Sequence, residues 1–191
     1  MSLKLLFAPF RGISLKAYRN AFASNIGGID TFYAPFISGT GRFRINTASL
    51  KDLLPDAKDN APGIPQYIGN SPQEMTLLAN TLQSSGLKEL NWNLGCPFSR
   101  IANKKRGCGL LPVPEEIDRI LEVYFNTSSL PLSIKTRLGY KTANELDAAI
   151  QVFNKYPLQY IIIHPRTGIQ RYGERQTPGC ISFTGKGLYT R

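Results

Sequence analysis

The sequence has 191 residues, of which 42% are hydrophobic, 19% charged and 10% aromatic, and its 23 Lys and Arg against 13 Asp and Glu give a net charge of +10. This composition is typical of a globular protein and excludes a disordered chain. No apolar run approaches the roughly 18–20 residues that a membrane span needs. The apolar stretch between Lys4 and Arg11 is too brief for a secretory signal, so we expect a cytoplasmic protein.

The cysteines and the single histidine indicate neither a metal site nor a disulfide scaffold. The chain has an odd number of cysteines, Cys96, Cys108 and Cys180, and no two of them have the spacing of metal ligands. With only one His in the chain, a zinc site is not expected, and this cysteine usage agrees with a cytoplasmic protein.

Part of the positive charge is concentrated in one segment, residues 100–106, which we call the basic segment. No acidic residue occurs between Gly95 and Leu110. Such a cluster is either a solvated surface or the contact for a polyanionic partner, most simply a nucleic acid. The basic residues of the segment are Arg100, Lys104, Lys105 and Arg106.

Apolar runs and helix signals predict the elements of the first half of the chain. Ser14 is predicted to cap the first helix and Pro35 to end the second strand. Ser71 and Glu74 have the spacing of a capping box, with Pro72 at the first helical position. The pattern predicts strands at residues 3–8, 30–34 and 64–68, helices at 14–23 and 71–84, a loop at 38–46 and a helical turn at 49–53.

The second half continues the alternation. Pro114 opens a helix with apolar residues on one face, and Thr142 and Glu145 form a second capping box. The predicted strands are residues 88–93, 132–135 and 159–163, with helices from 114 and at 142–155. Near-continuous apolar strands between capped helices indicate a parallel sheet covered by helices. The pattern stops after Tyr172, so we expect a barrel-like part at residues 1–172 and a tail at 173–191.

Uncommon polar residues fall at or just past the ends of these strands. In a (β/α)8 barrel, this is the face on which active sites are built. A Lys there needs an anionic partner, either a carboxylate or a cofactor edge, and a His there is either a satisfied core residue or a ligand contact. Arg166 is either a surface charge or a phosphate contact. The strand-end residues are Gln66, Asn93, Lys135 and His164, followed by Cys96 and Arg166.

Several motifs together are similar to those of one family. Asn93-Leu94-Gly95-Cys96-Pro97, Lys135-Thr136-Arg137-Leu138-Gly139 and His164-Pro165-Arg166-Thr167 carry the resemblance most specifically. The sequence resembles the tRNA-dihydrouridine synthases, flavin-dependent enzymes with a TIM-barrel catalytic domain. The other matching stretches are Ala8-Pro9 with Gly12, Gly28-Ile29-Asp30, Ala34-Pro35-Phe36-Ile37, Gln66-Tyr67-Ile68-Gly69, and residues 91–97 and 105–111.

The resemblance implies a role for each candidate residue. Pro9 would line the FMN, Gln66 and Lys135 would hydrogen-bond its isoalloxazine, and His164 would contact it. Asn93 would hold the target uracil and Cys96 would be the general acid, while Arg166 and the basic segment would meet tRNA. The implied reaction is reduction of FMN by NADPH, hydride transfer to uracil C6 and protonation of C5 by Cys96.

The sequence departs from the family at the first-strand motif and after the sixth strand. Phe10 stands where Met commonly follows the Pro. Only about six of the eight strands of a TIM barrel are predicted, so we expect open sheet edges at residues 3–8 and 159–163 and a chain that is truncated and poorly active alone. Two alternatives remain. One is a dihydroorotate-dehydrogenase-like FMN oxidoreductase acting on a free pyrimidine, which the basic segment disfavours, and the other is a non-catalytic RNA-binding fragment.

Overall fold

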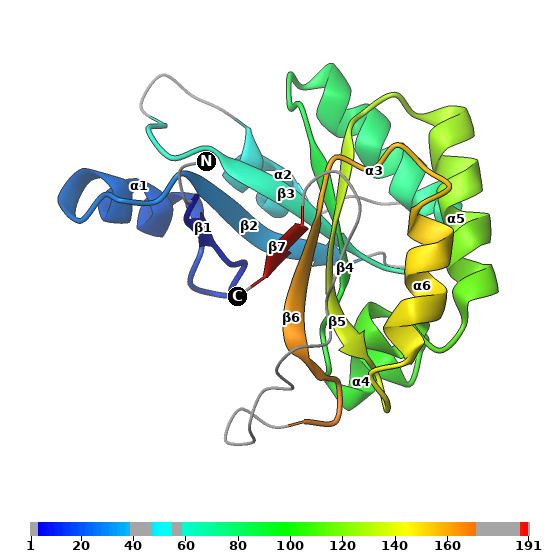
Figure 1. The fold of residues 1–191 in the computed structure, drawn as a ribbon. Coiled ribbons are helices and arrows are strands. Elements are labelled where there is room, and N and C mark those ends of the chain that lie inside the picture. Colours follow the sequence, from blue (N-terminus) through cyan, green and yellow to red (C-terminus); the bar gives the residue numbers. More distant parts are fainter. Residues whose placement is uncertain (1–3, 39–46, 55–58, 171–187, 191) are drawn as a thin grey trace.

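The strands form one parallel sheet whose order follows the chain (Figure 1). The computed structural model describes residues 4–38, 47–54, 59–170 and 188–190. Every neighbouring pair of strands is parallel. Within the described residues the strands are β1 (Leu6–Phe7), β2 (Thr31–Ser38), β3 (Gly63–Ile68), β4 (Leu90–Leu94), β5 (Leu132–Gly139), β6 (Ile161–Thr167) and β7 (Leu188–Thr190).

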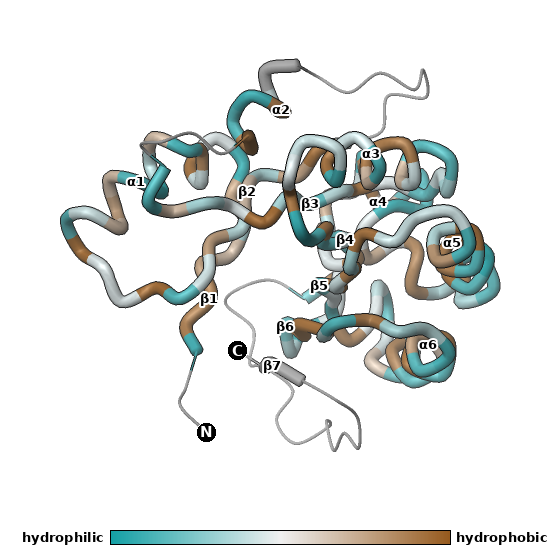
Figure 2. The backbone as a smooth tube through the Cα atoms, turned by 90° about the horizontal axis from the view of Figure 1, so that it is seen from above, coloured by the Kyte–Doolittle hydropathy of each residue, from teal (hydrophilic) through white to brown (hydrophobic). Residues whose placement is uncertain are grey.

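Seen from above, the strands follow an arc that is open between β1 and β7 (Figure 2). α3, α5 and α6 cover the convex side of this arc, which confirms the predicted α/β fold, a curled part of a TIM-type barrel. None of the helices in the described ranges is long and apolar enough to cross a membrane. The helical elements are α1 (Lys16–Asn25), α2 (Thr47–Leu53), α3 (Pro72–Ser84), α4 (Ser99–Ala102), the 3-10 helix η1 (Gly107–Leu110), α5 (Pro114–Thr127) and α6 (Glu145–Phe153).

The two faces of the sheet differ in polarity. Leu90, Trp92 and Leu94 of β4 belong to the core between the sheet and the helices. Because side chains alternate along a strand, Asn91 and Asn93 lie on the opposite, concave face, where they are also buried. The expectation of near-continuous apolar strands was therefore wrong for the central strands. Their polar residues line the inside of the arc.

Two of the predicted helix starts are confirmed. Ser71 caps α3 by accepting a hydrogen bond from the Glu74 backbone N–H at 3.3 Å, and Pro114 opens α5. Ser14 was wrongly predicted as a cap. Leu15 precedes α1, and the Ser14 hydroxyl bonds the backbone N–H and carbonyl of Phe10 instead. In the second predicted capping box, the Glu145 carboxylate accepts hydrogen bonds from the backbone N–H groups of Thr142 and its two predecessors. The helix itself, α6, begins only at Glu145, so Thr142 is not its cap.

Several strands extend beyond their predicted ends. Pro35 does not end β2, because the register shifts between Tyr33 and Phe36 and this irregularity accommodates the proline. β5 and β6 run past the predicted ends at Lys135 and residue 163, which places His164 and Arg166 inside β6. β1 is shorter than predicted. Most of the predicted loop at 38–46 lies outside the described residues.

The expectation of an open edge at the sixth strand was wrong. β7 pairs in parallel with β6, with Ile161 opposite Leu188 and Ile163 opposite Thr190. This pairing covers the backbone of β6 on the side away from β5, whereas β1 remains at the end of the described sheet. The division at residue 172 stays a prediction, because residues 171–187, which include Cys180, lie outside the described part.

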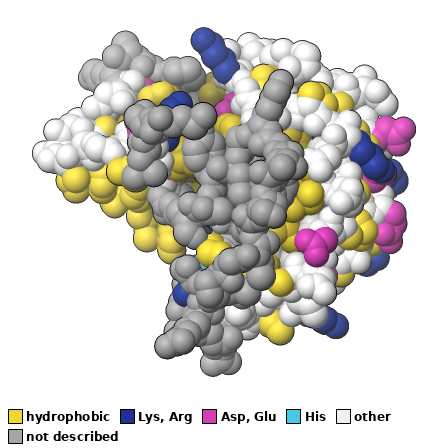
Figure 3. Space-filling model, in the orientation of Figure 1, with side chains coloured by type: hydrophobic (Ala, Val, Ile, Leu, Met, Phe, Trp, Pro, Cys, Tyr) yellow, Lys and Arg dark blue, Asp and Glu magenta, His cyan; other side chains and the backbone are white. Residues whose placement is uncertain are grey.

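Exposed apolar side chains gather around β1 and α1. Figure 3 shows hydrophobic atoms at this side of the molecule, and the rings of Phe7, Tyr18, Phe22 and Phe32 contact one another there. The buried Arg19 side chain of α1 links this segment to a later part of the same chain, because it donates hydrogen bonds to Asp52 and to the carbonyl oxygen of Ala61. The exposed members are Leu5, Phe10, Ile13, Leu15, Tyr18 and Ile26.

Candidate active site

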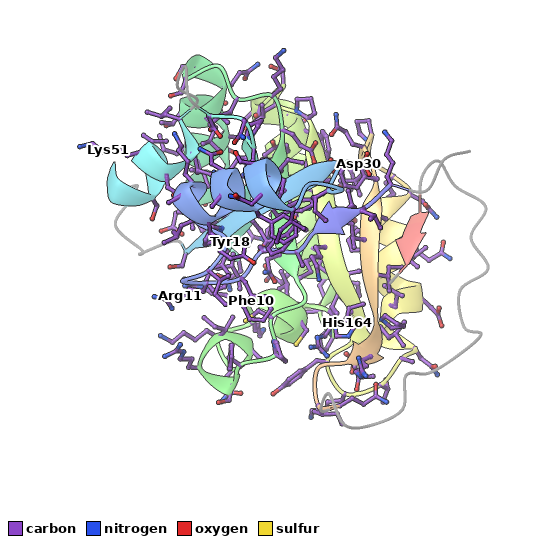
Figure 4. All side chains as sticks on the ribbon, turned by 90° about the vertical axis from the view of Figure 1, so that its left-hand side faces the viewer. Phe10, Arg11, Tyr18, Asp30, Lys51 and His164 are labelled. Atoms are coloured by element: carbon purple, nitrogen blue, oxygen red, sulfur yellow. The ribbon has the colours of Figure 1, made fainter. Side chains whose placement is uncertain are left out.

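The strand-end residues converge at one edge of the sheet. Asn93 of β4 lies opposite Lys135 of β5, and Arg137 of β5 lies opposite His164 of β6. Figure 4 shows His164 toward the C-terminal end of the strands and Asp30 at the other end. The parallel strands thus bring residues from distant parts of the sequence into adjacent positions, as the pattern of polar strand ends predicted.

The turn after β4 holds Cys96 in a defined position. The Asn93 Oδ1 atom accepts hydrogen bonds from the backbone N–H of Gly95 at 3.0 Å and of Cys96 at 2.9 Å, which is an Asx-type turn. On its other side, the Cys96 carbonyl accepts from both the N–H and the thiol of Cys108, each at 3.2 Å. Gly107 packs directly against Cys96 with a φ of +56°. The turn is therefore fixed from two sides, and Cys96 is 8% exposed.

The two described thiols have different environments. Cys108 is fully buried, and burial raises the pKa of its thiol to about 12. Its sulfur is engaged with the Cys96 carbonyl and lies behind the turn. Cys108 supports the turn, and Cys96 is the thiol at the strand-end edge.

Gln66 and Asn93 form a direct pair. The Asn93 Nδ2 atom donates to the Gln66 Oε1 atom at 2.7 Å, and both side chains are buried. The Asn93 amide nitrogen carries a second hydrogen that this bond does not use, and the Gln66 amide nitrogen donates to Asn91 instead. The pair joins β3 to β4 on the concave face.

His164 lies in a cationic environment. Burial lowers its pKa to about 4, and the charges of Arg137, Lys135 and Arg166 act in the same direction. The Arg166 Nη1 atom is 3.0 Å from the His164 Nε2 atom. Because a guanidinium can only donate, Nε2 accepts, and the neutral imidazole carries its proton on Nδ1. The site therefore combines several cations with a neutral histidine, which favours an anionic or electron-rich ligand.

Arg137 is a site residue to which the sequence reasoning gave no role. It is buried, its Nε atom donates to the Gly95 carbonyl at 2.9 Å, and its Nη1 atom donates to the Thr167 carbonyl at 2.8 Å. Arg137 thus ties the Cys96 turn to the end of β6. Its alternation with Lys135 along β5 was the available signal, because both residues lie on the same face.

The residues of the basic segment are not equivalent. Arg100, Lys104 and Lys105 are exposed, and the Arg100 guanidinium lies 5.9 Å from the ring centroid of Phe98. Arg106 is half-buried, and its Nε atom donates to the Asn70 Oδ1 atom at 3.3 Å. Three of the four positive charges therefore face solvent, while Arg106 links the segment to the loop after β3.

Comparison with known proteins identifies the family. A sequence model of dihydrouridine synthase (Dus) matches residues 6–178. The chain belongs to the dihydrouridine synthase family. A probable tRNA-dihydrouridine synthase of Staphylococcus epidermidis is 29% identical over 163 residues, which are 85% of this chain and 49% of the relative. Probable tRNA-dihydrouridine synthase 2 of Bacillus subtilis is 25% identical over 163 residues, again 85% of this chain and 50% of the relative.

The chain spans about half the length of these curated relatives. Among solved structures, the X-ray structure of a variant of NCR from Zymomonas mobilis aligns with a TM-score of 0.56 at 10% identity. The alignment covers 93% of this chain and 69% of that structure. At this identity the likeness concerns the fold alone.

The strand-end edge of the chain has a chemistry that suits a flavin. Lys135 and Arg137 place positive charge beside His164, which suits the electron-rich pyrimidine edge of an isoalloxazine. Gln66 adds a buried amide that can both donate and accept. Pro9 follows β1 at the same end of the sheet and is half-buried. No group of three or more His, Cys, Asp or Glu side chains suited to a metal occurs among the residues that the structure describes.

Proposed function

We propose that this chain forms the catalytic part of a tRNA-dihydrouridine synthase that reduces uridine to 5,6-dihydrouridine with FMN as cofactor and NADPH as reductant. The observation that carries the proposal is the Cys96 turn, held by Asn93 beside the cations Lys135, Arg137 and Arg166 that surround the neutral His164. Membership of the family and the names of the relatives support it.

The residues divide into those that bind the cofactor and those that act on the base. Lys135, His164, Gln66 and Pro9 would hold FMN, which supplies hydride transfer to the uracil ring when bound. Cys96 would hold a proton on its Sγ atom and deliver it to uracil C5. A thiol with its backbone fixed on both sides suits this task, because general acid catalysis depends on the position of the proton.

Asn93 has a restricted choice of contacts with the base. Its Oδ1 atom already accepts two backbone hydrogen bonds, and one Nδ2 hydrogen is donated to Gln66. The second Nδ2 hydrogen is the donor that Asn93 offers to a ligand. Asn93 would therefore contact a carbonyl oxygen of the uracil and not its N–H group.

The positive charges would contact the tRNA backbone. Arg100, Lys104 and Lys105 are exposed next to the Cys96 turn, and Arg166 lies beside His164. A protein that extrudes a base needs such contacts because the phosphates supply most of the affinity for nucleic acid. A tRNA substrate also implies a cytoplasmic protein.

Flavin retention and substrate choice test the proposal. If the proposal holds, the purified protein binds flavin and forms dihydrouridine in unmodified tRNA when NADPH is supplied, at a low level because the chain spans about half the length of its curated relatives, and it does not turn over dihydroorotate or orotate. Turnover of the free pyrimidine with no reaction on tRNA would instead establish the dihydroorotate-dehydrogenase-like function. RNA binding by a protein that retains no flavin would establish the non-catalytic alternative.

A further inference from the structure

A continuous row of hydrogen bonds crosses the concave face from the Cys96 turn to the opposite end of the sheet. From Asn93 the row passes through Gln66, whose Nε2 atom donates to the Asn91 Oδ1 atom at 2.7 Å. The Asn91 Nδ2 atom donates to the Ser133 Oγ atom at 2.8 Å, and the Ser133 hydroxyl donates to the Glu89 Oε1 atom at 2.6 Å. We call these five side chains the polar ladder: Asn93, Gln66, Asn91, Ser133 and Glu89.

The two ends of the polar ladder impose the same direction on every bond. At the Asn93 end of the ladder, the backbone N–H groups of Gly95 and Cys96 can only donate, so the Asn93 oxygen must face them and its nitrogen must face Gln66. At the Glu89 end, the Glu89 Oε1 atom accepts from both Ser133 and Tyr160. A rotated amide anywhere in the row would place two donors or two acceptors opposite each other.

Burial makes that direction energetically important. Gln66, Asn91 and Ser133 are fully buried, so a lost partner is not replaced by bulk water. Removing the Glu89 carboxylate leaves the Ser133 hydroxyl without its acceptor, and reorientation of the Asn91, Gln66 and Asn93 amides would relieve this mismatch. The orientation of Asn93, and with it the hold on the Cys96 turn, therefore depends on a carboxylate at the other edge of the sheet.

From this row we infer that Glu89 is a positioning residue that orients Asn93 and the Cys96 turn through Ser133, Asn91 and Gln66. The expected effect of Glu89 on catalysis rests on the proposed function of Cys96, whereas the expected effect of Glu89 on the turn does not. Glu89 lines a cavity of about 510 Å³ at the N-terminal edge of the sheet. A side chain of similar size at this position therefore has room, and substitutions there do not crowd the core.

The test is the alkylation rate of Cys96 by iodoacetamide in the purified protein, followed by peptide-resolved mass spectrometry. Glu89→Leu and Ser133→Ala should each raise the rate about fivefold, the change that one lost net hydrogen bond produces in a local opening equilibrium. Glu89→Gln keeps an acceptor oxygen for Ser133 and should leave the rate near that of the parent protein. The double variant should react no faster than either single variant, because both break the same row.

A matched control separates positioning from general loss of stability. Tyr124→Phe removes a buried hydrogen bond of 2.7 Å to the Leu130 carbonyl on the helix side of the sheet. It should lower the melting temperature without changing the alkylation of Cys96. If the Glu89 and Ser133 variants also lose only melting temperature, Glu89 is merely structural and the inference is overturned.

Steady-state kinetics add a second readout. Glu89→Leu should lower kcat for dihydrouridine formation while KM for tRNA stays unchanged, with recovery of kcat in Glu89→Gln. A change in KM alone would contradict a positioning role. If no variant, including the parent, turns over tRNA, the proposed function fails, and the alkylation result still decides whether Glu89 positions the turn.

Discussion

Gly107 offers a direct mechanical test of the Cys96 turn. A Cβ atom added at Gly107 would lie 2.6 Å from the Cys96 carbonyl oxygen and 3.0 Å from the Cys96 Cβ atom, so Gly107→Ala must displace the turn. The residue also has a φ of +56°, which costs an L residue about 1–2 kcal/mol. Crowding a packed site adds roughly 1–3 kcal/mol. The expected loss of unfolding free energy is the sum of both effects.

Gly86 provides the matched control for this substitution. Its φ is +85°, but a Cβ atom there would have no neighbour within 4 Å. Gly86→Ala should therefore lose only about 1–2 kcal/mol from backbone strain. Urea denaturation gives the stability of each variant, and iodoacetamide labelling gives the reactivity of Cys96.

Only Gly107→Ala should change Cys96 reactivity and dihydrouridine formation. The reason is that only its new methyl group presses on the Cys96 backbone. Equal stability losses in the two variants, with Cys96 reactivity unaltered in both, would refute the reasoning that Gly107 fixes the turn by close approach.

Two further predictions concern the charges of the site. The pKa of His164 is about 4 against an ordinary 6.5, so its proton NMR signal should not titrate between pH 5.5 and 8, and a midpoint near 6.5 would contradict this. The free energy of unfolding should fall as the pH drops from about 6.5 toward 4, because only the unfolded chain gains the proton in this range. If Arg100, Lys104 and Lys105 contact phosphates, their replacement by Ala should reduce the salt slope of tRNA binding by roughly 0.7–0.9 for each contact. Arg106 stays in place because it bonds Asn70, and an unchanged slope would make the three exposed charges a solvated surface.

Two helix starts and the adjacency of the strand-end residues could be predicted because they follow from local signals and from the parallel direction of the strands. Ser71 and Pro114 mark helix starts by side-chain and backbone chemistry that acts within one turn, and both predictions were confirmed. Polar residues at the ends of parallel strands predict one edge, and Asn93 and Lys135 are adjacent there.

The rest depends on contacts between distant strands. Pro35 was wrongly predicted to end β2, because the register shift that accommodates it involves the pairing with β3. The polar ladder needs the register of β3, β4 and β5, which places Gln66 and Ser133 on either side of Asn91. The period-two alternation of Asn91 and Asn93 was a visible signal of a polar concave face, but it does not name their partners.

The most direct measurement is single-turnover reduction of unmodified tRNA by the flavin-loaded protein and by its Cys96→Ala variant. Removing a positioned general acid lowers a rate by about 10²–10⁴-fold. The variant should therefore retain its flavin, because the residues proposed to hold it are unchanged, and form dihydrouridine at least about a hundredfold more slowly. Dihydrouridine formation at the parent rate in Cys96→Ala would contradict the account.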